Sequence, residues 1–187
     1  MPLAGGTPIA LASNLCGADG IAVDSSNVYV GVSGNGSVLE IPIAGGAPII
    51  HTVAEFGVGP VAVDASNVYW LSLSSNGSHV VVSKSPIGAP SPTVLTPSLF
   101  ATGSTACGQS APILAVDSIN VYWTVESANI TLMKMPTGGG SPVALAVLVD
   151  NAQPGVNIGA FATDAENAST QFAFSAMLER VPLVVCA

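Results

Sequence analysis

Four copies of one short sequence block recur along this chain, and this repetition constrains the fold more than any other feature. Each copy has three mostly apolar residues, then an aspartate, and then an asparagine three positions later. The aspartates, which are 40, 53 and 47 residues apart, are Asp24, Asp64, Asp117 and Asp164. In the first three copies a tyrosine follows two positions after the asparagine, and these are the only three tyrosines in the chain. Such a period indicates a series of similar supersecondary units.

Each unit contains short segments with strand character, and none shows helical periodicity. In the first unit the expected strands are residues 21–24, 28–33, 37–42 and 48–53. An Asn-Gly dipeptide, which favours a type I′ hairpin turn, separates the second and third segments at residues 35–36 and again, in the next unit, at 76–77. Four antiparallel strands per repeat are typical of a β-propeller blade. The sequence therefore predicts an all-β fold, a β-propeller with four four-stranded blade repeats.

The predicted propeller is a single domain that covers residues 1–187. Its blade repeats lie at about 18–55, 58–98, 111–149 and 158–183, and residues 1–13 are expected to be the end of a third strand followed by a fourth strand at 8–13. Two architectures remain open. The strand at 8–13 completes the last blade and closes a four-bladed ring, or the chain is an arc or fragment of a larger propeller. The start within a strand favours the fragment.

The repeat resembles the YWTD/NHL group of β-propellers. The resemblance rests on Gly-Ile-Ala-Val-Asp at 20–24, Asn-Val-Tyr-Trp at 67–70 and Met-Lys-Met-Pro-Thr-Gly-Gly at 133–139, and it covers nearly the whole chain. It is closest to repeats in bacterial proteins that are predicted to be secreted, which implies an extracellular or cell-envelope location. Residues 122–125 read Tyr-Trp-Thr-Val in place of the YWTD tetrapeptide. Ligand recognition by YWTD receptors is therefore not expected to carry over.

The charge of the chain argues against several functions. Its net charge is −8 and it has only three basic residues, so we expect no binding to nucleic acid, which requires clustered lysine and arginine. Although 49% of the residues are hydrophobic, no apolar run reaches the roughly 18–20 residues that a membrane-spanning helix needs. The N-terminus lacks the basic and apolar regions of a signal peptide.

The repeated aspartates are the leading candidates for a chemical site. In a closed ring Asp24, Asp64, Asp117 and Asp164 would form a circle of carboxylates, which could hold a hard cation through oxygen ligands. Alternatively, each aspartate accepts backbone hydrogen bonds within its own turn. The asparagine three positions after every aspartate favours the turn, so we predict neither a metal nor a cofactor.

Other candidate residues have structural interpretations as well. The repeated aromatics could be a ligand platform, but their recurrence favours packing between blades; they are Tyr29, Tyr69, Tyr122, Trp70 and Trp123. A charged residue stands two positions before the proline of each third strand, and alternation predicts that it faces solvent; these residues are Glu40, Lys84, Lys134 and Arg180.

The histidines and cysteines suggest no further site. His51 and His79 are isolated in different repeats, and zinc requires three or four converging ligands. Cys16, Cys107 and Cys186 are widely separated, and we expect no intrachain disulfide.

These observations predict a non-enzymatic binding or scaffold propeller whose ligand is an unidentified protein, peptide or glycan. Self-association is expected if the ring stays open, because the flanks of the end blades would be apolar and exposed. The alternative is a propeller hydrolase or lyase with a cation held in the central channel by the repeated aspartates.

Overall fold

The computed structural model describes residues 7–75, 79–96, 99–101, 112–126, 130–148, 157–162 and 171–175. All regular secondary structure in these segments is β-strand, as the sequence predicts. Within the same segments there is no helix long and apolar enough to cross a membrane.

The strands form three antiparallel sheets in which sequence neighbours pair. The first sheet contains β1 (Ala18–Val23), β2 (Asn27–Val32), β3 (Ser37–Pro42) and β4 (Ile49–Thr52). The second contains β5 (Val61–Val63), β6 (Asn67–Leu73), β7 (His79–Pro86) and β8 (Thr93–Val94), and β9 (Leu99–Ala101) also pairs with β7. The third contains β10 (Leu114–Val116), β11 (Asn120–Glu126), β12 (Ile130–Pro136) and β13 (Val143–Leu148). A separate hairpin consists of β14 (Asn157–Ala162) and β15 (Gln171–Ser175).

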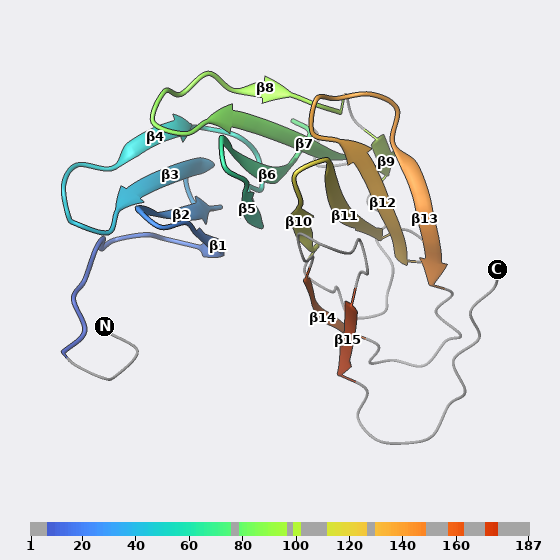
Figure 1. Cartoon of the computed structure of the whole chain (residues 1–187), viewed down its shortest axis with the longest axis horizontal. Coiled ribbons are helices and arrows are strands. Elements are labelled where there is room, and N and C mark those ends of the chain that lie inside the picture. The colour runs from blue at the N-terminus through green and yellow to red at the C-terminus, as the bar shows by residue number, and fades with distance from the viewer. Residues whose placement is uncertain are drawn as a thin grey trace.

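The three sheets follow one another along an arc, as propeller blades do (Figure 1). Strand β5 contacts β1 on one side and β10 on the other, so the first strand of each sheet lies on the inside of the arc. The last strands, β4, β8 and β13, lie on the outside. The described sheets do not close into a ring, and of the fourth repeat the structure describes the β14–β15 hairpin.

The central strand β6 is apolar on both faces because the second sheet is sandwiched between the first and the third. In β6, Val68 and Trp70 face the first sheet, whereas Tyr69 and Leu71 face the third. All four are buried. Side chains alternate between the two faces of a strand, and a strand that is covered on both faces must therefore be apolar at consecutive positions.

Two hydrophobic clusters fill the spaces between the sheets. Tyr29 and Val38 of the first sheet pack with Trp70 and Val61 of the second. The second cluster joins the second and third sheets in the same way, with Tyr69 on one side and Trp123 on the other. The predicted packing between blades is thus confirmed for Tyr29, Tyr69, Trp70 and Trp123. Tyr122 is buried against Leu132 and Ala146 of its own sheet instead.

Two local predictions were wrong. Residues 8–13, expected as a strand, belong to no strand, and the nearby Ala12 and Leu15 pack against the first sheet instead. The segment was expected to complete the last blade, whose end at residues 176–187 lies outside the described residues. Residues 35–36 do not form a two-residue type I′ turn, because Val32 pairs with Ser37 across a four-residue loop in which Asn35 does not adopt positive φ.

Candidate functional site

The repeated aspartates hold the turns between the first and second strands of the sheets. In the first sheet, Oδ1 of Asp24 accepts hydrogen bonds from the backbone N–H groups of Ser26 and Asn27, at 2.6 and 2.7 Å. Oδ2 accepts a hydrogen bond of 2.7 Å from the Tyr29 hydroxyl. The Asp24 N–H in turn donates to the carbonyl oxygen of Asn27. Both carboxylate oxygens therefore have partners within six residues of sequence.

The same geometry recurs in the next two sheets. Oδ1 of Asp64 and of Asp117 each accepts two backbone hydrogen bonds of 2.6–2.7 Å. Their Oδ2 atoms accept from the hydroxyls of Tyr69 and Tyr122 at 2.7 and 2.8 Å. These bonds are the turn chemistry that the sequence favoured. Asp164 lies outside the described residues.

The turn hydrogen bonds also determine the protonation of these groups. Burial acts to raise the pKa of Asp24, but the hydrogen bonds from Ser26, Tyr29 and Asn27 outweigh it and hold the pKa below its usual value. The pKa of Asp117 is lowered in the same way against the effect of burial, with a further contribution from the charge of Lys134. These two aspartates therefore stay ionised at neutral pH.

The pKa values of the three tyrosines are shifted in the opposite direction. Burial, followed by the hydrogen bond to the neighbouring carboxylate, raises the pKa of Tyr29, Tyr69 and Tyr122. The hydroxyls of Tyr29 and Tyr122 are therefore neutral donors to the ionised carboxylates of Asp24 and Asp117, and such charge-assisted bonds are stronger than neutral ones.

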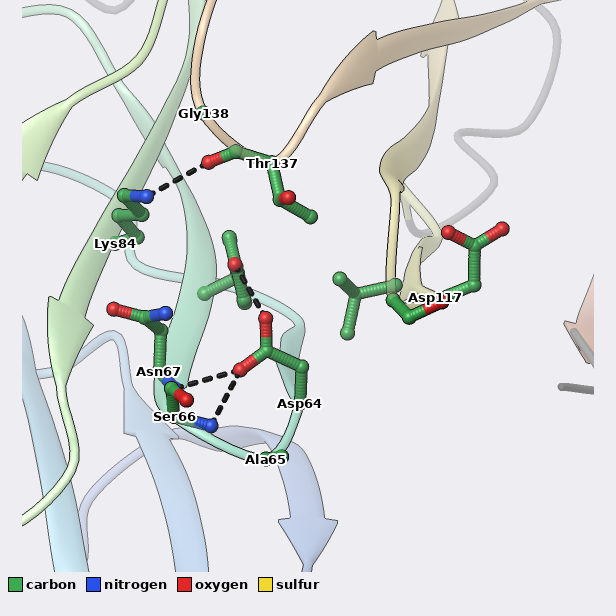
Figure 2. A pocket seen from close by; sticks show the side chains of 11 residues that line it. Asp64, Ala65, Ser66, Asn67, Lys84, Asp117, Thr137 and Gly138 are labelled. Carbon is green, nitrogen blue, oxygen red and sulfur yellow. Dashed lines mark hydrogen bonds between the residues drawn. The ribbon is translucent and has the colours of Figure 1, made fainter.

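A shallow pocket of about 470 Å³ lies between the second and third sheets, beside their aspartate turns. Its walls include Asp64, Ser66 and Lys84 from the second sheet and Asp117 and Ser118 from the third. Figure 2 shows Asp64 directed toward its own turn, with Asp117 on the other side of the pocket and its carboxylate pointing away from Asp64. The pocket therefore brings two of the predicted aspartates to one site without converging their carboxylates.

The described residues contain no group of three or more His, Cys, Asp or Glu side chains arranged to hold a metal ion. The candidate cation ring is accordingly not assembled from Asp24, Asp64 and Asp117.

The charged position before the third-strand proline connects neighbouring sheets. Lys84 on β7 donates from Nζ to the carbonyl oxygen of Thr137 in the third sheet, at 2.7 Å (Figure 2). Glu40 on β3 is only 3% exposed. Its Oε2 accepts from the backbone N–H of Gly88 in the second sheet at 2.8 Å. The prediction of a solvent-facing position is therefore wrong for Glu40, because the turn of the next sheet covers it.

His51 is likewise not isolated. Its Nε2 lies 2.9 Å from Oε2 of Glu40, and both side chains are buried. No sequence pattern pointed to this pair, because the outer strand β4 brings His51 beside Glu40 through a register irregularity between β3 and β4.

The remaining candidates fall in different places. Cys16 is exposed and has a free thiol. Three other candidate residues of the sequence analysis lie outside the described part of the chain; they are Arg180, Cys107 and Cys186. A residue that sequence reasoning missed is Glu55, which accepts from the Trp70 indole N–H at 2.9 Å and from the Thr52 hydroxyl at 2.8 Å.

Comparison with known proteins adds evidence on the fold. No protein-family model matches the chain, and neither does the sequence of any curated protein. A crystal structure of a nidogen/laminin complex is similar to it, with a TM-score of 0.56 and 18% sequence identity over 79% of this chain. This chain spans about half of that one, since the match covers 52% of it.

The crystal structure of the computationally designed Ika4 protein is also similar, with a TM-score of 0.54 and 17% identity. That match covers 91% of this chain and 98% of the designed one. At these identities the likenesses establish the propeller-like fold alone.

Proposed function

We propose that this chain is a non-catalytic binding or scaffold β-propeller with four blade repeats, and that its ligand is a protein segment bound at the pocket between the second and third sheets. The proposal rests on the hydrogen bonds that the repeated aspartates form. Asp64 and Asp117 are bonded into their own turns, so they shape the pocket wall but form no cluster that could activate water or a metal.

The pocket offers chemistry suited to a polar segment of a partner. Exposed Ser66 and Ser118 supply hydroxyls, and the ionised carboxylate of Asp117 attracts donors. A net charge of −8 further favours basic ligands through long-range attraction. One of the similar solved structures is a nidogen/laminin complex, and this likeness supports a protein partner over a glycan here.

We also propose, from the resemblance to repeats of secreted bacterial proteins, that the chain acts outside the cytoplasm. Cell fractionation followed by detection with an antibody tests this, and recovery from the cytoplasm alone would contradict it.

A display selection tests the ligand site. Peptides from a random library are selected on the purified wild-type chain and then assayed against Ser118→Arg, which places a long side chain at the pocket. Ser25→Arg is the matched control, since Ser25 is exposed and holds the corresponding turn position in the first sheet. We expect selected peptides to lose binding to Ser118→Arg, by about tenfold or more, and to retain it with Ser25→Arg.

Equal binding to both variants would overturn the pocket assignment. Binding of oligosaccharides in a glycan array, lost in Ser118→Arg, would replace the protein ligand by a glycan at the same pocket.

A further inference from the structure

An Asn-Gly dipeptide, Asn35 and Gly36, lies in the loop between β2 and β3. Asn35 is exposed. Its Oδ1 accepts a hydrogen bond of 2.7 Å from the hydroxyl of Ser37, the buried first residue of β3. The Asn35 side-chain carbonyl is therefore polarised by a fixed donor.

The fold requires glycine at position 36. Gly36 has a φ of 65°, a conformation that glycine adopts without steric cost, and a Cβ at this position would overlap the backbone of Glu55. The Gly36 N–H donates to no acceptor among the described residues. The nitrogen that follows Asn35 in the chain is thus neither shielded by a side chain of its own residue nor held in a hydrogen bond.

We propose that Asn35 is a covalent modification site, at which the side chain cyclises onto the Gly36 nitrogen and is converted to aspartate or isoaspartate. Hydroxide takes the proton of the Gly36 N–H, and the nitrogen forms a bond to Cγ of Asn35. The electron pair of the C=O bond moves to Oδ1, where the Ser37 hydroxyl stabilises the negative charge. The C=O bond then re-forms as the bond from Cγ to Nδ2 breaks, and Nδ2 takes up a proton and leaves as ammonia.

Water opens the resulting five-membered succinimide ring in one of two ways. Cleavage between Cγ and the Gly36 nitrogen gives aspartate and restores the main chain. Cleavage between this nitrogen and the main-chain carbonyl carbon of residue 35 gives isoaspartate, in which the main chain runs through Cβ and Cγ and the former carbonyl becomes a free carboxylate. In both cases the reaction consumes one water and releases one ammonia.

Isoaspartate at position 35 would disturb the contact between this loop and the segment that follows β4. The carbonyl oxygens of Asn35 and Gly36 accept hydrogen bonds from the backbone N–H groups of Ala54 and Glu55, each 3.1 Å long. Glu55 in turn accepts from the indole N–H of Trp70, which is buried between the first two sheets. A lengthened main chain displaces these acceptors, so the modification should loosen the link between the two sheets.

Mass spectrometry of the full chain after incubation at neutral and mildly alkaline pH tests the proposal. Pepsin digests the samples in acid, where hydroxide is scarce and the reaction stops. We expect the Asn35 peptide to change from amide to acid in two chromatographically distinct forms, faster at the higher pH. Asn14 is the internal control, because it is exposed but precedes Leu15, whose side chain hinders attack by the following nitrogen. It should remain an amide.

The same measurement on the urea-unfolded chain isolates the contribution of the fold. Both samples contain the same Asn-Gly-Ser sequence, but only the folded chain holds the hydrogen bond from Ser37 to Asn35. We expect Asn35 to react at least as fast in the folded chain as in the unfolded one. Slower reaction in the folded chain would overturn the proposal, since the loop would then keep the side chain away from the Gly36 nitrogen.

A pair of serine variants tests the role of the donor. Ser37→Ala should slow the reaction of Asn35 in the folded chain by about tenfold and leave its rate in urea unchanged. Ser33→Ala is the matched control, because the Ser33 hydroxyl belongs to the same loop but donates to the carbonyl of Gly17. It should react like the wild type. An unchanged rate in folded Ser37→Ala, with its circular dichroism spectrum intact, would contradict activation by Ser37.

Discussion

At the scale of single residues, the aspartate–tyrosine pair is the unit from which each turn is built. One carboxylate joins two backbone N–H groups and a tyrosine hydroxyl that comes from the adjacent strand. The rings of Tyr29 and Tyr69 are at the same time buried between two sheets. The pair thus connects the local geometry of a turn to the packing of the neighbouring blade.

The ionisation of the tyrosines gives a test of this unit. Free tyrosine has a pKa of about 10, and the pKa is raised in all three tyrosines here. A raised pKa contributes stability that is present below pH 10 and lost as pH rises through the folded pKa. In an ultraviolet absorbance titration we expect no tyrosinate signal at pH 10, and a signal at higher pH that appears together with unfolding. Reversible ionisation near pH 10 in the folded chain would contradict the buried pairs.

At the scale of strands, a charged side chain on the third strand of the first and of the second sheet forms a hydrogen bond to the next sheet. The sign of the charge at this position matches the backbone group that the following turn presents. Glu40 accepts from the N–H of Gly88, whereas Lys84 donates to the carbonyl of Thr137. Opposite charges can therefore occupy one repeat position and join the sheets in the same way.

Substitution of the two residues should differ in cost because their burial differs. Glu40→Ala removes a buried acceptor from both His51 and the Gly88 N–H, and we expect a loss of about 3 kcal/mol in the free energy of unfolding. Lys84 is only half-buried and makes one such bond, so Lys84→Ala should cost about 1 kcal/mol. Urea denaturation measures both. A loss in Glu40→Ala no greater than in Lys84→Ala would contradict the buried role of Glu40.

At the scale of the whole molecule, the described sheets leave the inner strand β1 uncovered. Ile21 of β1, Val61 of β5 and Leu114 of β10 stand three positions before the repeated aspartates. Val61 and Leu114 are buried by the preceding sheet, whereas Ile21 is 70% exposed. The difference arises because no described sheet precedes the first one along the arc.

This difference predicts how alanine substitutions act. Leu114→Ala should lower the free energy of unfolding by about 2–5 kcal/mol, as truncation of a buried leucine does. Ile21→Ala should cost about 0.5 kcal/mol or less, as at exposed sites. Chemical denaturation compares the two. Similar losses at both positions would show that a further blade covers β1 and closes the ring.

The sequence by itself determined the features that depend on contacts within a few residues. Asp24, Ser26 and Asn27 lie close enough in the chain for the turn to form from local hydrogen bonds. The spacing of the repeats and the apolar central strands predicted the sheets and the burial of Trp70 and Trp123 in the same way. Such features recur from copy to copy, so a comparison of the repeats is enough to identify them.

Only the tertiary structure decided what depends on the position of one sheet against the next. Glu40 and Gly88 are 48 residues apart, and the alternation of the strand predicts a solvent-facing side chain until the neighbouring turn is placed over it. The pairing with His51 and the pocket beside Lys84 arise in the same way. Their partners come from different strands or sheets, so the free energy of each contact depends on packing that the local sequence does not encode.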